Sequence, residues 1–255
     1  MPIEILTVPC LADNYAYILH DKLSNKTTLV DAPAFDPIRE QLEKQNWTLD
    51  NILLTHHHDD HIAGVAELVK HYNASVFGAK ADSNRLPYLD VALTDRDKFS
   101  ASNLIFRCIE VPGHTLGHLA FYCASENIVF TGDSLMALGC GRIFEGTPKQ
   151  MFESLTKLKG LPDNTKVYSG HEYARQNAKF AITVDPDNTE LRDRSKRVLT
   201  NFDLQIPNAQ STILEEKNTN PFLRSGNLEI WKSLGHKSKD PLKIFTLLRE
   251  MKNNF

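Results

Sequence analysis

The chain has 255 residues, of which 41% are hydrophobic and 24% charged, and its formal net charge is −3. These values are typical of folded, soluble chains, and they exclude a disordered polymer, a collagen-like repeat and a small disulfide scaffold. No apolar run approaches the roughly 18–20 residues that are needed to cross a bilayer, so we expect no association with a membrane.

The start of the chain has neither a basic segment nor a long apolar core, which argues against a secretory signal. Its early Glu4 and its lack of arginines argue against an organelle transit peptide. The four cysteines are scattered and form no Cys-x-x-Cys pair, as expected for buried thiols in a reducing compartment. No block of like charge is long enough for a nucleic-acid tail. We therefore expect a cytoplasmic protein whose main partner is not a nucleic acid.

Short apolar runs bounded by turn residues predict strands through the first two thirds of the chain. These runs are Ile3–Val8, Tyr15–Leu19, Thr27–Val30, Ile52–Leu54, Leu104–Val111, Leu119–Cys123, Ile128–Thr131 and Lys166–Tyr168. A helical pattern of apolar residues over 62–72 follows the fourth run. Thr147, Pro148 and Gln150 predict a capped helix between Gly146 and Gly160.

Beyond about residue 172 the strand signals fade. Amphipathic segments predict helices at 173–184, 188–206, 226–234 and 241–252, and Asp240-Pro241 is a start signal for the last. The pattern predicts a mixed αβ domain over residues 1–170, followed by a smaller helical domain over 171–255.

A histidine-rich segment follows directly on the apolar run 52–54. His56 and His58 lie two residues apart, so they cannot share one face of a helix, but in a looping segment they can converge on one ion. Asp60 and His61 come next, where the chain turns into the predicted helix. Imidazoles and a carboxylate suit zinc or another first-row divalent ion.

Three further strand-like runs end in a glycine and then a potential metal ligand: His114, Asp133 and His171. Any one of them alone is more typical of an ordinary polar residue, and an isolated histidine run is as typical of a solvated loop. Strand ends along one edge of a sheet, however, are where α/β proteins commonly build sites. The potential ligands suit two ions that share one carboxylate; they are His56, His58, Asp60, His61, His114, Asp133 and His171.

The His-x-His-x-Asp-His pattern at 56–61 resembles the signature of the metallo-β-lactamase superfamily. Within it, the chain resembles the glyoxalase II (hydroxyacylglutathione hydrolase) family nearly from end to end. The segments that specify this branch are Gly139-Cys140-Gly141-Arg142, Phe144-Glu145-Gly146-Thr147, Gly170-His171-Glu172-Tyr173 and Leu248-Arg249-Glu250-Met251-Lys252.

This resemblance implies an α/β fold, a four-layer αββα metallo-β-lactamase-like sandwich with a C-terminal helical domain. It also implies two divalent ions, zinc first, with iron or manganese as alternatives. One metal takes His56, His58 and His114, and the other takes Asp60, His61 and His171. Asp133 bridges the two and positions them, while Asp60 completes one coordination shell rather than acting as a nucleophile.

Glutathione binding is implied for Arg142, Tyr173, Arg249 and Lys252. Arg249 and Lys252 are three residues apart, so they share a helix face and suit a carboxylate. The alternative is a solvated helix end whose cations complement the helix dipole. Phe144 departs from relatives that carry tyrosine there.

The implied activity is hydrolysis of S-D-lactoylglutathione and related 2-hydroxyacyl glutathione thioesters, in methylglyoxal detoxification, by a hydroxide held between two metals. The thiolate leaving group needs no strong general acid. One alternative is a glutathione persulfide dioxygenase-like enzyme with a single iron, and another is a non-catalytic binder of glutathione conjugates. The expected partner is a small-molecule thioester, and the expected oligomeric state is a monomer.

Overall fold

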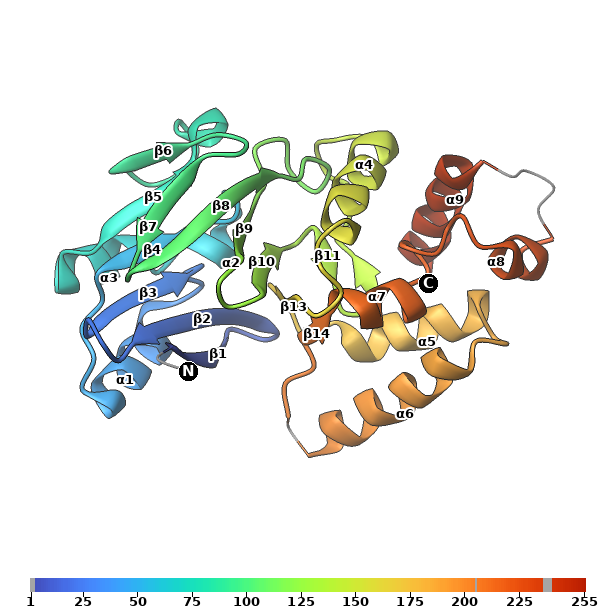
Figure 1. Cartoon of the computed structure of the whole chain (residues 1–255), viewed down its shortest axis with the longest axis horizontal. Coiled ribbons are helices and arrows are strands. Elements are labelled where there is room, and N and C mark those ends of the chain that lie inside the picture. Colours follow the sequence, from blue (N-terminus) through green and yellow to red (C-terminus); the bar gives the residue numbers. More distant parts are fainter. Residues whose placement is uncertain (1–2, 205, 236–239) are drawn as a thin grey trace. The chain divides into compact units, whose positions relative to one another are not determined.

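A computed structural model describes residues 3–204, 206–235 and 240–255 (Figure 1). The chain divides into two compact units. The first consists of Met1–Glu110 and Gly117–Gly132, and the second of Val111–Leu116 and Asp133–Phe255. These compact units do not follow the expected domain boundary at residue 170. That boundary stays a prediction. Among the described residues, no helix is long and apolar enough to cross a membrane.

The first unit contains a six-stranded mixed sheet in the order β1-β2-β3-β4-β5-β6. Its strands are β1 (Ile3–Cys10), β2 (Asn14–Asp21), β3 (Lys26–Val30), β4 (Asn51–Leu53), β5 (Ser75–Ala79) and β6 (Val91–Leu93). Strands β1 to β3 pair antiparallel, and β3 to β6 pair parallel. The predicted strands in this region are confirmed, while β5 and β6 lacked a signal strong enough to be predicted.

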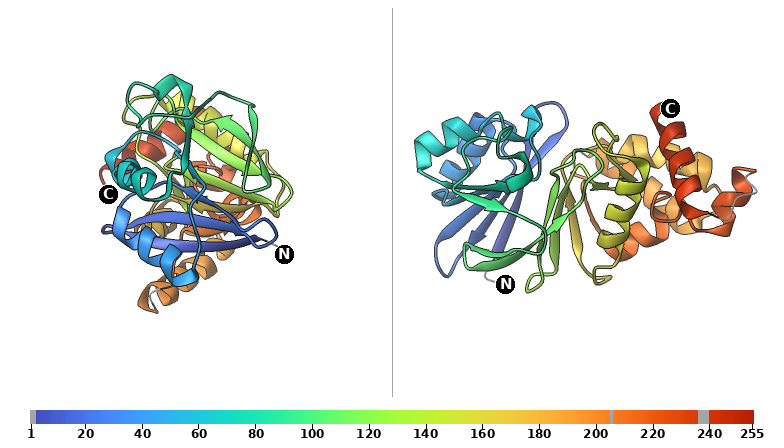
Figure 2. Two further views of the ribbon diagram at one scale, coloured as in Figure 1. Left: turned by 90° about the vertical axis from the view of Figure 1, so that its left-hand side faces the viewer. Right: turned by 90° about the horizontal axis from the view of Figure 1, so that it is seen from above.

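Helices α1 (Phe35–Gln45) and α3 (Val65–Tyr72) lie side by side against this sheet (Figures 1 and 2). The single helix expected over 62–72 is two helices, the short α2 (Asp59–Ile62) and α3. Gly64 separates them, and a Cβ there would lie 2.7 Å from the Ala34 carbonyl carbon. The chain therefore comes too close to the start of α1 for any side chain at this position.

A second sheet of the first unit contains β7 (Lys98–Ala101), β8 (Leu104–Glu110), β9 (Leu119–Cys123) and β10 (Ile128–Gly132), with neighbouring strands antiparallel. The two sheets pack face to face through aromatic rings. Phe77 on β5 stacks on Phe99 of β7 at 5.1 Å between ring centroids, and Tyr17 on β2 lies 5.5 Å from Phe130 of β10. Such ring pairs bury large apolar areas and hold the sandwich together.

The second unit carries two short antiparallel pairs, β11 (Leu135–Met136) with β12 (Gly139–Cys140) and β13 (Lys166–Ser169) with β14 (Gln210–Thr212). Strand β14 lies in the region where only helices were expected. The helices are α4 (Pro148–Lys159), α5 (Ala174–Val184), α6 (Thr189–Asp203), α7 (Ile213–Thr219), α8 (Leu228–Ser233) and α9 (Pro241–Asn253). They confirm the predicted helical segments, and α7 is an addition.

A buried polar network holds the turn between β11 and β12. Glu216 on α7 pairs with Arg194 of α6 and accepts a hydrogen bond from the Leu138 amide at 3.0 Å. Asn220 donates to the Gly139 carbonyl at 2.9 Å and to Glu216. Because a buried charge is costly unless it is paired, this network ties the helices to one arrangement of the turn.

Candidate metal centre

The first unit presents a histidine pair in the loop between β4 and α2. His56 lies in that loop and His58 is the N-cap of α2, so neither is in a helix, as expected. His56 Nε2 lies 3.1 Å from His58 Nδ1, and His56 is fully buried. Two nitrogens bound to one zinc ion at about 2.0–2.1 Å in tetrahedral geometry are separated by about 3.3 Å. The pair is therefore spaced for a shared ion.

Asp31, at the end of β3, orients His61. Its carboxylate accepts hydrogen bonds from the Thr55 amide and hydroxyl, both at 2.8 Å, and lies 2.8 Å from His61 Nδ1. This contact favours the tautomer that carries its proton on Nδ1 and leaves Nε2 for a metal. No role was expected for Asp31. The signal that could have found it is a buried acid at a strand end.

Asn14, at the start of β2, holds Asp60 in the same way. Its side-chain amide donates to the Asp60 carbonyl at 2.9 Å and to Asp60 Oδ2 at 3.0 Å. Asp60 Oδ2 lies 3.8 Å from His61 Nε2. The amide thus fixes the direction of a carboxylate that was expected to bind metal.

The remaining histidines near this loop have other surroundings. The ring of His118 is buried and stacks on His56 with 4.7 Å between centroids. His57 Nδ1 contacts Asp82 at 3.2 Å, and Asp82 also accepts a bond from Arg85. Neither histidine was expected to be a ligand.

The second unit brings His114, Asp133 and His171 together. Asp133 Oδ2 lies 3.4 Å from His114 Nε2 and 3.2 Å from His171 Nε2, and all three side chains are buried. His114 Nδ1 lies 2.8 Å from the Arg142 carbonyl oxygen, so Nε2 is the nitrogen that could bind a metal. One carboxylate between two imidazoles is the arrangement expected of a bridging ligand.

Two glycines beside these residues allow close approach of the backbone. Gly113 has φ +151°, and a Cβ there would lie 2.7 Å from Met151 Cβ of α4. A Cβ at Gly141 would lie 1.9 Å from the Asp133 carbonyl oxygen. The backbone can therefore pass close beneath the ligands only where these positions are glycine.

All seven expected ligands belong to clusters of histidine and aspartate of a kind that can hold a metal ion. Imidazole nitrogens and carboxylate oxygens are the donors that first-row divalent cations prefer. The donor set therefore fits divalent metal binding.

Arg249, expected to bind glutathione, is buried in the second unit. Its Nη1 donates to the Cys140 carbonyl at 2.8 Å and its Nε to Asn253 at 3.1 Å. A solvated helix end does not describe this side chain. Arg249 instead holds the turn that leads from β12 to Arg142.

The other expected glutathione contacts also lie in the second unit. Burial and the nearby Arg249 and Arg142 lower the pKa of Lys252 to about 8. Tyr173 stacks on His171 with 4.7 Å between centroids. Phe144 is exposed, and its ring centroid lies 5.2 Å from that of His114. The Tyr173 and Phe144 rings thus lie beside the histidines of this unit, and Arg249 and Arg142 lie close enough to Lys252 to lower its pKa.

Comparisons with known proteins agree with this arrangement. Residues 14–171 match the family described as the metallo-beta-lactamase superfamily, and residues 172–255 match the family described as hydroxyacylglutathione hydrolase C-terminus. Hydroxyacylglutathione hydrolases of Ruegeria pomeroyi and Cereibacter sphaeroides are 49% and 46% identical to this chain, each over 100% of both chains. The crystal structure of ETHE1 from Myxococcus xanthus has a TM-score of 0.71 at 25% identity, covering 98% of this chain and 90% of that one.

The α/β sandwich, with histidines and aspartates at its strand ends and helices toward the C-terminus, defines a metallo-β-lactamase fold. This confirms the expected fold class. More narrowly, the chain belongs to the hydroxyacylglutathione hydrolase family, a family of thioester hydrolases, as its resemblance predicted.

Proposed function

We propose that this chain hydrolyses S-D-lactoylglutathione and related 2-hydroxyacyl glutathione thioesters to glutathione and a 2-hydroxy acid, in methylglyoxal detoxification. The relatives over the full length are hydroxyacylglutathione hydrolases. The observation that carries the proposal is Asp133, whose Oδ2 stands within 3.4 Å of the Nε2 atoms of both His114 and His171. A complete set of ligands for two ions favours hydrolysis over the single-iron alternative.

The proposed centre contains two divalent ions, zinc in the first instance. His56, His58 and His114 would hold one ion, Asp60, His61 and His171 would hold the other, and Asp133 would contribute its carboxylate to both. When bound, such ions lower the pKa of water toward about 7 and polarise the thioester carbonyl. The spacing of His56 and His58 and the orientation of His61 by Asp31 support this assignment.

Side chains of the second unit would bind the glutathione part of the substrate. Glutathione carries two carboxylates, and Arg142 and Lys252 supply cations close enough together to depress the pKa of Lys252. Tyr173 offers a ring and a hydroxyl beside His171. Arg249 is the fourth proposed glutathione-binding residue, and it also keeps the Gly139–Arg142 turn in place through the Cys140 carbonyl. The thiolate leaves without a strong general acid, because an ordinary thiol has a pKa of about 8.5.

Turnover of S-D-lactoylglutathione tests the proposal. Thioester loss and thiol release are followed with protein of known metal content, then after chelation, and again after metal is restored. We expect rapid turnover that chelation abolishes and metal restores. Asp133→Ala and His171→Ala should each lose it, because each removes a ligand, and Asp187→Ala, on the exposed α5–α6 loop, is the matched control.

Intact turnover in Asp133→Ala and His171→Ala would contradict the proposal. Absence of turnover at full metal occupancy, with sulfite formation and oxygen uptake from glutathione persulfide, would establish the single-iron alternative. Binding of glutathione conjugates by the metal-loaded protein without turnover of either compound would establish a non-catalytic binder.

We also propose that the protein acts in the cytoplasm as a monomer. Its four cysteines are buried free thiols, and burial raises the pKa of Cys10 to about 11 and that of Cys108 to about 12. Such thiols suit a reducing compartment. Light scattering of the metal-loaded protein would test the oligomeric state.

A further inference from the structure

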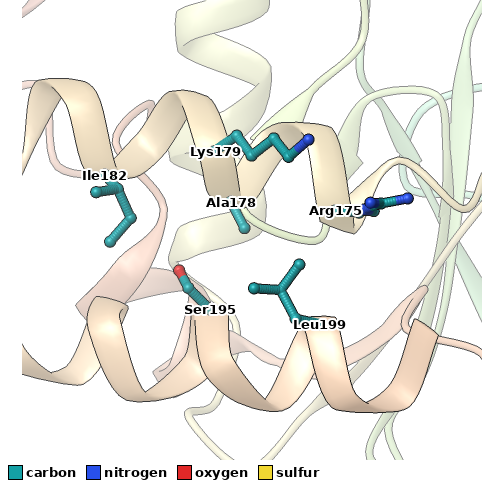
Figure 3. A pocket seen from close by; sticks show the side chains of 6 residues that line it. All are labelled: Arg175, Ala178, Lys179, Ile182, Ser195 and Leu199. Atoms are coloured by element: carbon teal, nitrogen blue, oxygen red, sulfur yellow. The ribbon is translucent and has the colours of Figure 1, made fainter. Parts of the chain in front are cut away.

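A pocket with a volume of about 290 Å³ lies between helices α5 and α6 of the second unit, apart from the expected metal and glutathione residues (Figure 3). Side chains from both helices line it. They are Arg175, Ala178, Lys179 and Ile182 from α5, and Ser195 and Leu199 from α6. Its volume is near the lower end of the range of small-molecule sites.

The walls of this pocket are apolar along much of their length. Ala178, Ile182 and Leu199 supply aliphatic groups, and Leu199 is 42% exposed although it faces the pocket. In Figure 3 these three side chains stand around the gap between the two helices. The pocket therefore offers contact to a hydrocarbon chain, whose burial there would remove apolar surface from water.

One end of the pocket is positively charged. Arg175 and Lys179 are four residues apart on α5, so they share a helix face, and in Figure 3 their nitrogens lie toward the same end. The Arg175 guanidinium is packed over the Phe202 ring, 4.4 Å from its centroid. No acidic residue is among the described residues that line the pocket. Two cations on one helix face, one of them held by stacking, suit a carboxylate.

Two buried polar atoms of the lining residues have no hydrogen-bond partner within the described part of the chain. They are Arg175 Nε and Ser195 Oγ. The Ser195 hydroxyl points from α6 into the space facing α5 (Figure 3). A buried donor without a partner is costly, so groups of this kind call for a ligand or water.

We propose that this pocket binds a small amphipathic carboxylate, a monocarboxylic acid with a short hydrocarbon tail. The carboxylate pairs with Arg175 and Lys179, and the tail lies along Ala178, Ile182 and Leu199. This site goes beyond the proposed hydrolase function, and its occupancy is measured without any thioester.

Octanoate is the probe, titrated into metal-loaded, isotopically labelled full-length protein by calorimetry and by amide chemical shifts. We expect one molecule per chain, with the largest shifts at Ser195 and Leu199. Arg175→Gln should weaken binding about tenfold because it removes a charged donor. Each methylene removed from the probe should weaken it about fourfold, and neutral octanamide should bind about tenfold more weakly than octanoate.

Lys196→Gln is the matched control, since it removes an equal charge from α6 at an exposed residue outside the pocket. It should leave octanoate affinity unchanged. Three results would each overturn the proposal: no saturable binding up to the solubility limit of octanoate, equal weakening by Arg175→Gln and Lys196→Gln, or binding that disappears on chelation, which would place octanoate at the metals. If the native protein bound octanoate but had no thioesterase activity, that result would contradict the proposed hydrolase function and leave the pocket proposal standing.

Discussion

Asp31 shows how much a single carboxylate can organise in this protein. It is buried, it adopts a left-handed backbone conformation with φ +57°, and it engages both Thr55 and His61. A non-glycine residue in this conformation is uncommon outside turns and functional positions. Asp31 therefore adopts an unfavourable backbone conformation at the position where its carboxylate orients His61.

We expect Asp31→Asn to weaken metal binding by about tenfold to a hundredfold, because a neutral amide orients and polarises His61 less well than a carboxylate. Competition with a chelating dye measures the affinity. Asp36→Asn, an exposed change on α1, should leave it unchanged. Equal affinity of Asp31→Asn and the native protein would contradict the assignment.

Lys252 should make substrate binding depend on pH. Its pKa is lowered to about 8 by burial first and then by Arg249 and Arg142. The ammonium form predominates below that pH and attracts a carboxylate, whereas the neutral amine above it does not. KM for S-D-lactoylglutathione should therefore rise as the pH increases through about 8.

In Lys252→Met this rise in KM should disappear, and KM should already be high at neutral pH. Steady-state kinetics between about pH 6 and 10 measure the profile, and KM is read apart from kcat because metal-bound water titrates as well. Lys232→Met, at an exposed lysine of α8, should retain the native profile. A pH-independent KM in the native protein would exclude the role of Lys252.

At the scale of the element, helix α4 positions His114, a proposed metal ligand that lies outside the helix. Ser154 on α4 donates to the Pro112 carbonyl at 2.7 Å, and Met151 packs on Gly113. Both contacts are made to the segment directly before His114. The capping box predicted from Thr147 and Gln150 is present at the start of α4. The Gln150 backbone N–H donates to Thr147 Oγ1, and the Thr147 backbone N–H donates to Gln150 Oε1.

Thr147→Ala should lower the free energy of unfolding by about 1 kcal/mol, because the first turn of α4 loses its side-chain acceptor. Urea unfolding of the native and variant proteins measures the difference. Thr156→Ala on the same helix removes only an exposed bond to the Phe152 carbonyl and should cost less than about 0.5 kcal/mol. Equal losses in the two variants would show that the cap does not stabilise α4.

At the scale of the whole molecule, each compact unit carries some of the seven proposed metal ligands. His56, His58, Asp60 and His61 belong to the first unit, and His114, Asp133 and His171 to the second. The segment Val111–Leu116 belongs to the second unit although the chain on either side of it belongs to the first. The compact units are therefore not two continuous stretches of the chain.

The sequence by itself determined the ligand types, their order along the chain and the elements with strong local patterns. The strands that are followed directly by a histidine or aspartate, and the capped helix α4, can be predicted because their signals lie within a few residues. Only the tertiary structure decided the partners of those ligands. Asp31 meets His61 across 30 residues, and Arg249 meets Cys140 across 109. Such contacts leave no local periodicity, because they depend on where distant strands and helices come together.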